Sequence, residues 1–241
     1  MQKSSSASAA FFVFLLALSG FPVTDCAMAE KDILNNEKRV YSQFDEEVII
    51  RDFFQDKKNG VFLDVGAADY QRNSTTYYLE KNLGWSGVAV DALKYYEDGF
   101  LKHRPKTKFE HYIVTDHSGN METFYITRAI PDVSSTNPNY VQEYAPVTHA
   151  VQIKTITLND LLEKNNIQSL DFLSMDIEDG EPKALAGFDV QKYRPKLVCI
   201  EAHETVRDQI YDYFIKNGYE RIEKYRDRDK LNYYFTPKKQ S

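Results

Sequence analysis

Cysteine is scarce in this chain, whose 241 residues include only Cys26 and Cys199. Two cysteines cannot build the disulfide framework of a small secreted domain. A chain of this length can bury roughly 70% of the surface that it exposes when unfolded, so it needs neither disulfides nor a structural metal to hold a core. Cys199 lies in the apolar run KLVCIEA, and we expect it to be a buried core residue.

An excess of positive charge is also missing. Lysine and arginine number 30 against 36 aspartates and glutamates, which gives a formal net charge of −6. Nucleic-acid-binding domains usually carry a basic surface. The most basic stretch, residues 221–230, has acids among its lysines and arginines and is typical of a solvated rim. We therefore predict no nucleic-acid partner.

The N-terminal segment has no apolar run long enough to cross a membrane comfortably. Its run AAFFVFLLAL covers residues 9–18, whereas a bilayer span takes roughly 20 residues. Lys3 precedes this run and the small-residue pattern Ala27-Met28-Ala29 follows it, which is typical of a secretory signal. We predict a signal peptide over residues 1–29 and an exported, periplasmic or secreted, domain over residues 30–241. An uncleaved membrane anchor or a cytoplasmic protein remains the alternative, and we expect membrane contact only through this segment.

Short apolar runs alternate with amphipathic segments after residue 30. The runs predict strands at 61–67, 87–92, 108–116, 170–177 and 196–202. The amphipathic segments predict helices at 30–55, 74–83, 95–103, 158–164, 181–188 and 205–217. Strands without alternating polar residues favour a mostly parallel sheet with helices on both faces, an α/β fold. We expect a hairpin at 117–128, an irregular loop at 129–146 and an antiparallel strand pair at 219–225 and 231–236.

The sequence Asp64-Val65-Gly66-Ala67-Ala68-Asp69 follows the first predicted strand. Ligands of open α/β sheets bind at the carboxyl ends of the strands, where small residues let a ligand approach the backbone. A dinucleotide site would need the glycines of G-x-G-x-x-G, but only one glycine is present. S-adenosylmethionine has no phosphate and carries an ammonium and a sulfonium, so acids beside the loop suit it. A tight turn that binds nothing is the structural alternative.

Asp91 ends the second predicted strand, 27 residues after Asp64, and Ala92 follows it. An acid at this position can accept hydrogen bonds from both ribose hydroxyls. This role fits S-adenosylmethionine and NAD equally, so Asp91 indicates a nucleoside without choosing between them. We place Ala68, Ala92 and Asp116, which ends the third predicted strand, in the same predicted cofactor site.

Three further polar residues follow the fourth and fifth predicted strands. Asp176 and Glu178 come after LDFLSM, and His203 comes after KLVCIEA. Such groups can hold a donor, bind a hard cation or accept a proton. We predict Asp176 and His203 as catalytic residues, and Asp176 and Glu178 as ligands of a divalent cation such as Mg²⁺. A solvated acidic turn and a histidine that caps the next helix are the structural alternatives.

Four segments together resemble the FkbM-type methyltransferases: residues 42–47 (SQFDEE), 61–92, 157–189 and 195–203. The resemblance implies a class I methyltransferase with a Rossmann-like fold and an antiparallel terminal strand pair. It also implies that Asp64, Gly66 and Asp91 contact S-adenosylmethionine, with Asn73 and Ser74 at the first helix of that site. Asp176 and Glu178 correspond to the family's acidic pair. Asp91 and Asp179 depart from the residues that members often have there, which are Glu and Gly.

The resemblance predicts an S-adenosylmethionine-dependent O-methyltransferase that acts on a hydroxyl of a sugar or a small natural product. We expect a small-molecule or glycan substrate, and the sequence is silent on the oligomeric state. An NAD-linked oxidoreductase and a catalytically inactive exported binding module are the alternative functions.

Overall fold

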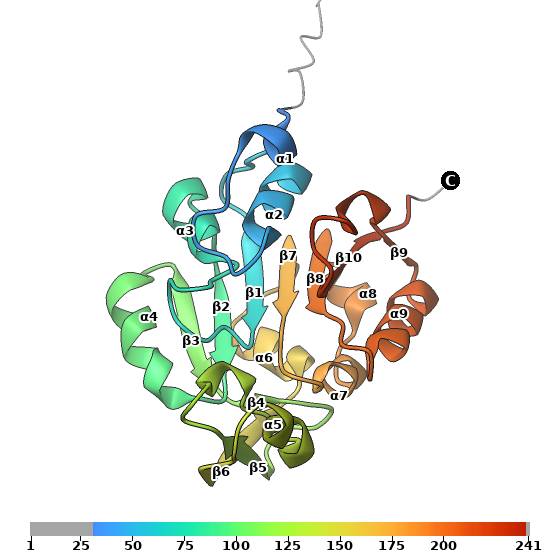
Figure 1. Cartoon of the computed structure of the whole chain (residues 1–241). Helices are drawn as coiled ribbons and strands as arrows, with labels where there is room; N and C mark the ends of the chain where they lie inside the picture. The colour runs from blue at the N-terminus through green and yellow to red at the C-terminus, as the bar shows by residue number, and fades with distance from the viewer. Residues whose placement is uncertain (1–30, 240–241) are drawn as a thin grey trace, which may run out of the picture. The chain divides into compact units, whose positions relative to one another are not determined.

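The computed structural model describes residues 31–239, so the predicted signal peptide and its cleavage site lie outside the described residues. A seven-stranded sheet forms the centre of the domain, in the order β3-β2-β1-β7-β8-β10-β9 (Figure 1). Its strands are β1 (Val61–Val65), β2 (Ser86–Asp91), β3 (Thr107–His111), β7 (Phe172–Met175), β8 (Leu197–Glu201), β9 (Tyr219–Arg221) and β10 (Asn232–Pro237). The first five pair in parallel, whereas β10 is antiparallel to both β8 and β9. The predicted mostly parallel sheet with an antiparallel terminal pair is confirmed.

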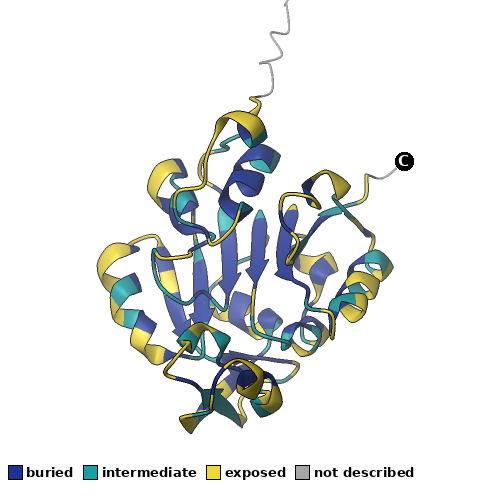
Figure 2. Ribbon diagram, in the orientation of Figure 1, coloured by how far each residue is buried: buried dark blue, intermediate teal, exposed yellow. Residues whose placement is uncertain are grey.

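Helices cover both faces of this sheet. They are α1 (Ile33–Asn36), α2 (Glu46–Phe54), α3 (Tyr77–Leu83), α4 (Glu97–His103), α5 (Pro138–Tyr144), α6 (Leu158–Lys164), α7 (Glu181–Ala186), α8 (Val190–Tyr193) and α9 (Arg207–Lys216), with 3₁₀ turns η1 (Lys94–Tyr96), η2 (Pro131–Val133) and η3 (Glu223–Tyr225). The strands between the helices are buried (Figure 2). No helix among residues 31–239 is long and apolar enough to cross a membrane.

Consecutive residues of β1 show how the two faces are filled. Leu63 belongs to a cluster with residues of α6, α7 and α9. Phe62, its neighbour in sequence, belongs to a different cluster with residues of α2 and α3. Side chains alternate between the faces of a strand, so a central strand buried on both sides is apolar throughout. The predicted α/β fold, a mostly parallel sheet with helices on both faces, is confirmed.

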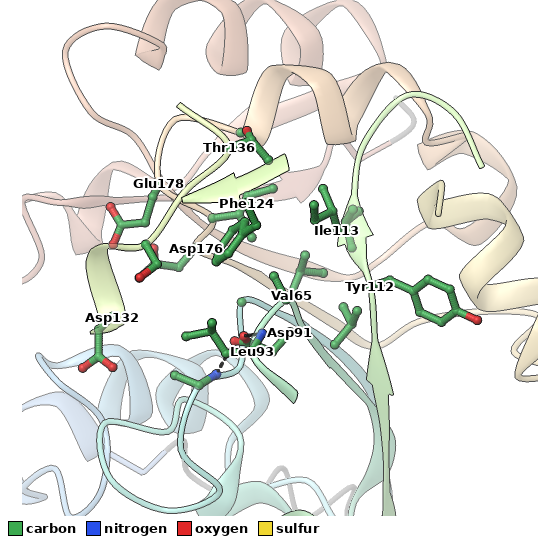
Figure 3. A pocket seen from close by; sticks show the side chains of 18 of the residues that line it. Val65, Asp91, Leu93, Tyr112, Ile113, Phe124, Asp132, Thr136, Asp176 and Glu178 are labelled. Carbon is green, nitrogen blue, oxygen red and sulfur yellow. Dashed lines mark hydrogen bonds between the residues drawn. The ribbon is translucent and has the colours of Figure 1, made fainter. Parts of the chain in front are cut away.

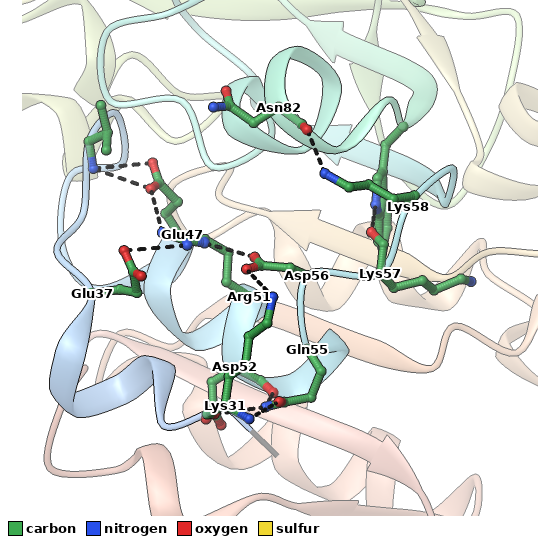
Figure 4. Close-up of polar contacts among 12 residues, drawn as sticks. Lys31, Glu37, Glu47, Arg51, Asp52, Gln55, Asp56, Lys57, Lys58 and Asn82 are labelled. Carbon is green, nitrogen blue, oxygen red and sulfur yellow. Dashed lines mark hydrogen bonds and ion pairs between the residues drawn. The ribbon is translucent and has the colours of Figure 1, made fainter. Parts of the chain in front are cut away.

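The helix predicted over residues 30–55 is wrong as a single element, because residues 37–45 are not helical between α1 and α2. The buried carboxylate of Glu47 accepts hydrogen bonds from the backbone N–H groups of Val40 and Tyr41. Arg51, also buried, pairs with Glu37, Glu47 and Asp56 (Figure 4). These contacts provide hydrogen-bond and ion-pair partners for residues 37–45 in a non-helical conformation. The apolar periodicity alone predicts a helix there.

The hairpin predicted over residues 117–128 is also wrong. The strand β5 (Met121–Ile126) pairs instead with β6 (His149–Ile156), and β4 (Ile113–Val114) pairs with the other edge of β6. The stretch predicted as a loop, residues 129–146, contains η2 and α5, and the Asn137 side chain caps α5 by accepting hydrogen bonds from two backbone N–H groups. We call residues 113–156 the cap, since this second sheet and α5 lie beyond the carboxyl ends of β1 and β2 (Figure 1).

Glu46 makes the stability of the domain depend on pH. It begins α2, is only 6% exposed and accepts a hydrogen bond from the Phe44 N–H at 2.6 Å. Burial, with a smaller effect from nearby Asp229, raises its pKa from 4.5 to about 7. Between these values the folded state holds a proton that the unfolded chain has lost. The stability that Glu46 contributes is therefore complete below the lower value, falls as the pH rises through the upper value, and then levels off.

We expect Glu46→Gln to remove this dependence. The free energy of unfolding of the wild type, relative to the variant, should fall by about 3 kcal/mol between about pH 5 and about pH 8. Urea unfolding at the two pH values measures it. Glu220→Gln, an exposed acid on β9, is the matched control and should keep the pH dependence of the wild type. Identical pH dependence in wild type and Glu46→Gln would contradict the assignment.

Candidate active site

The carboxyl ends of three neighbouring strands touch one another. Gly66, directly after β1, has φ +79°, and a Cβ there would lie 1.7 Å from the backbone oxygen of Asp176. The Gly66 N–H donates to the Val90 carbonyl at 2.9 Å, and the Asp176 N–H donates to the Val65 carbonyl at 2.9 Å. Only glycine combines this backbone conformation with this close approach. The single glycine of the sequence motif therefore joins the tips of β1, β2 and β7.

A pocket opens at this edge, with a volume of about 630 Å³ counted to its open mouth. Its apolar wall includes Val65, Leu93, Ile113 and Phe124 (Figure 3). Four acids line it as well: Asp91, Asp132, Asp176 and Glu178. Small-molecule sites are typically concave and mostly apolar, with a few polar groups that fix orientation. This pocket suits a nucleoside, whose base is flat and whose sugar carries hydroxyls.

Asp91 is fixed at the tip of β2 by two backbone hydrogen bonds. One oxygen accepts from the Ala68 N–H at 2.9 Å and the other from the Leu93 N–H at 2.7 Å. Burial raises its pKa to about 6 in spite of these bonds. Each carboxylate oxygen can accept further bonds. Asp91 is thus a preoriented acceptor for hydroxyl groups in the pocket.

Four of the eight predicted cofactor residues line the pocket: Gly66, Ala68, Asp91 and Ala92. Asp64 does not, because it is only 4% exposed and accepts a hydrogen bond from the Thr76 hydroxyl at 2.6 Å in the interior. Burial raises its pKa. Thr76 in turn accepts from the guanidinium of Arg104 at 3.1 Å. Asp64 therefore supports the loop after β1 from the interior and does not form part of the pocket wall.

The other three predicted cofactor residues also lie outside the wall. The buried hydroxyl of Ser74 accepts from the Tyr77 N–H at 3.1 Å and so holds the first turn of α3. Asn73 is exposed and forms an isolated parallel β-bridge with Ser42. Asp116 has a side chain 50% exposed, hydrogen-bonded to His117. For Asp64 and these three, direct contact with a donor stays a prediction.

Beside the pocket lies a group of acids around one histidine, which we call the acidic cluster: Asp176, Glu178, Glu181, Glu201 and His203. The His203 Nε2 lies 3.0 Å from the Glu201 Oε2 and 3.7 Å from the Glu178 Oε2. Tyr140, from α5 of the cap, donates to Glu178 and lies 3.2 Å from the His203 Nε2. The cluster is therefore built from the tips of β7 and β8 and closed by the cap.

The cluster holds protons more tightly than isolated side chains do. Asp176 is exposed to the open pocket, but the protein that surrounds it on its other sides, and then the charges of Glu201 and Glu178, keep its pKa well above its usual value. Hydrogen bonds to Glu178 and Glu201 raise the pKa of His203 to about 11. A carboxylate with a raised pKa is a stronger base than an ordinary aspartate. Of the two predicted catalytic residues, Asp176 lines the pocket and is better suited to accept a proton.

Sequence reasoning assigned no role to Glu201 or Asp132. Glu201 could have been found, because it ends the same strand that precedes His203. Tyr140 and Asp132 belong to the cap, where no motif marks them. The predicted metal pair also differs from the arrangement in space: Glu178 groups with Glu201 and His203, whereas Asp176 groups with Glu181 and Glu201.

The family model described as the methyltransferase FkbM domain matches residues 64–221, well over half of the chain. The chain belongs to the FkbM methyltransferase family. The resemblance stated from the sequence is confirmed. As an FkbM methyltransferase the chain uses S-adenosylmethionine as its donor, which decides the choice of cofactor that Asp91 left open.

Two solved structures illustrate what this FkbM domain is similar to. A TehB-like S-adenosylmethionine-dependent methyltransferase from Corynebacterium glutamicum has 13% identity and a TM-score of 0.45, over 85% of this chain and 91% of that one. A methyltransferase from Geobacter sulfurreducens in complex with S-adenosyl-L-homocysteine has 9% identity and a TM-score of 0.41, over 79% of this chain and 70% of that one. No curated protein sequence matches the chain.

The role of the close approach at Gly66 can be tested by comparison with a glycine that also has a positive φ but has free space around its Cα. Gly119 has φ +90° and nothing within 4 Å of an added Cβ. Both alanine variants should lose about 1–3 kcal/mol from backbone strain. Gly66→Ala should lose clearly more in urea unfolding, and it should weaken donor binding in calorimetry at least about tenfold, about 1.4 kcal/mol. Equal effects of the two substitutions would refute the role of Gly66.

Proposed function

We propose that this FkbM methyltransferase transfers the methyl group of S-adenosylmethionine to a hydroxyl oxygen of a sugar or a small natural product. The observation that carries the proposal is that one pocket holds both Asp91, suited to a ribose, and Asp176, suited to accept a proton. The first group anchors a donor and the second serves an acceptor. Their common cavity puts both partners of a transfer within reach of each other.

The donor half of the pocket matches the chemistry of S-adenosylmethionine. The carboxylate of Asp91 would accept hydrogen bonds from the ribose hydroxyls, and Leu93, Ile113 and Phe124 offer apolar surface to the adenine. The loop at Gly66 leaves no side chain between the ligand and the backbone. These residues bind and orient the donor, and that is most of what the transfer requires.

The acceptor half supplies a base, the Asp176 carboxylate, which is exposed to the pocket. When bound, the donor would supply a methyl group activated by its positive sulfur, with S-adenosylhomocysteine as the leaving group. The proton of the acceptor hydroxyl passes to the Asp176 carboxylate. The cap encloses this region, because Tyr140 donates to Glu178 and the Ser135 hydroxyl donates to the Glu178 carbonyl at 2.8 Å.

The acids of the pocket favour an acceptor rich in hydroxyls. Asp132, Asp176 and Glu178 can accept hydrogen bonds from several hydroxyl groups, as a sugar presents them. The same acids would repel an anionic acceptor, and the net charge of −6 disfavours a nucleic acid. Export of the enzyme remains part of the proposal and rests on residues 1–29 alone.

Asp91→Ala tests the donor half. The variant loses two charge-assisted hydrogen bonds to the ribose, so its affinity for S-adenosylmethionine should fall about 100-fold. Isothermal titration of the purified chain measures this. Asp98→Ala, an exposed acid on the neighbouring helix α4, is the control and should bind as the wild type does. Unchanged affinity in Asp91→Ala would remove the donor from this pocket.

Asp176→Asn tests the acceptor half. With tritium-labelled donor and a panel of sugars, the wild type should form alkali-stable labelled ethers. The variant should transfer about 100-fold more slowly, because it lacks the proton acceptor, while its donor affinity stays within about threefold. The control Asp179→Asn changes an acid outside the pocket wall, bonded to Thr205. Donor binding by the wild type without label in any hydroxyl acceptor would favour the inactive binding module instead.

A further inference from the structure

The acidic cluster has too little positive charge of its own. Its four carboxyl groups fall into two sets of neighbouring ligand atoms that share Glu201: Glu178 and Glu201 with His203, and Asp176 and Glu181 with Glu201. Only the first set contains a group that can carry positive charge. Within residues 31–239 no lysine or arginine pairs with any of these four acids, and their only ion pairs are with His203. Like charges gathered in a partly buried site are destabilising unless a cation compensates them.

Glu181 is an acid of the cluster that lies in the protein interior without a positively charged partner. It is 0% exposed, and one of its carboxylate oxygens accepts a hydrogen bond from the Ile177 N–H at 2.8 Å. The other oxygen, Oε2, is buried without a hydrogen-bond partner. This carboxylate stands within 4.8 Å of ligand atoms of both Asp176 and Glu201. A buried oxygen left without a partner calls for an explanation, and a bound cation would supply one.

The spacing of the polar atoms around His203 suits a small divalent cation. Octahedral ions with bonds near 2.1 Å place adjacent ligand atoms about 3.0 Å apart. The His203 Nε2 lies 3.0 Å from the Glu201 Oε2 and 3.7 Å from the Glu178 Oε2, so small side-chain movements would complete the set. A single imidazole N–H can serve one carboxylate well, whereas a cation that displaces the Nε2 proton serves all three groups. Glu178 lines the pocket and gives an ion a path of entry.

We propose that Glu178, Glu201 and His203 ligate a divalent cation of the manganese class, with Asp176 and Glu181 adding negative charge around it. Carboxylates favour Mg²⁺ and Mn²⁺, and the imidazole shifts the preference toward a transition metal. Glu201 is the central ligand, because it belongs to both groups of potential ligands. A cation here would lie beside the acceptor and could lower the pKa of its hydroxyl. That catalytic role rests on the proposed function, whereas the binding itself does not.

The test is a titration of the full chain with Mn²⁺ after removal of metals by a chelator, with free Mn²⁺ followed by electron paramagnetic resonance. We expect about one Mn²⁺ bound per chain, displaced by excess Mg²⁺, and at least about tenfold weaker binding in Glu201→Gln. Since Glu201 is buried, His203→Gln is the second variant, because this side chain is 23% exposed and its loss should disturb folding less. Circular dichroism confirms that each variant is folded.

Glu204→Gln is the matched control. This glutamate lies next to His203 in sequence, but its side chain is 91% exposed and pairs with Arg207. It should bind Mn²⁺ as the wild type does. No binding by the wild type, or equal binding by the wild type and both cluster variants, would overturn the site and leave His203 as a charged partner of the acids. Methyl transfer without Mn²⁺ binding would reject the site alone, and Mn²⁺ binding without methyl transfer would reject the proposed function alone.

Discussion

The contact between the backbones of Gly66 and Asp176 is the constraint on which the rest of the site depends. Because the loop after β1 passes against the loop after β7, no side chain fits at position 66. The same loop delivers the Ala68 N–H to Asp91, which fixes the acid that faces a ribose. The neighbouring loop carries Asp176 and Glu178 into the same pocket. Donor binding and proton transfer are thus adjacent because two loops touch.

A buried polar network supports these loops from the interior. The guanidinium of Arg104 donates to Glu80 at 2.6 Å, to the Tyr70 carbonyl at 3.0 Å and to Thr76 at 3.1 Å. The Thr76 hydroxyl in turn donates a hydrogen bond to the Asp64 carboxylate. A buried charge is tolerated only when it is paired and hydrogen-bonded, so these groups hold one another in place. Asp64, an acid of the predicted cofactor motif, is therefore part of this buried polar network.

The sequence was a good guide where local patterns decide the structure. The strands β1, β2, β7 and β8 are apolar runs. Asp91, which ends β2, and Asp176, which follows β7, line the pocket as expected. Asp64 does not line the pocket, and its position in the sequence alone does not reveal this. It shares a face of β1 with Phe62, two residues earlier, and that face packs toward α3 and away from the pocket.

The cap escaped prediction because long-range pairing decides its structure. The strand β5 pairs with β6 across the segment that holds α5, and no local signal joins two strands so far apart in sequence. Tyr140 reaches the acidic cluster only through that arrangement. The helix predicted over residues 30–55 failed for a similar reason, because a carboxylate from α2 binds the backbone of the residues before it.

Cys199 has a consequence that concerns the chemistry of the surroundings. It lies in β8 between Ser174 of β7 and Tyr234 of β10, is 2% exposed, and burial raises the pKa of its thiol well above the usual value. The thiolate is the form that reacts with oxidants and exchanges with other thiols. While the domain stays folded, the Cys199 sulfur is accessible neither to oxidants nor to other thiols. Cys199 of the folded domain should therefore stay a free thiol in reducing and in oxidising media.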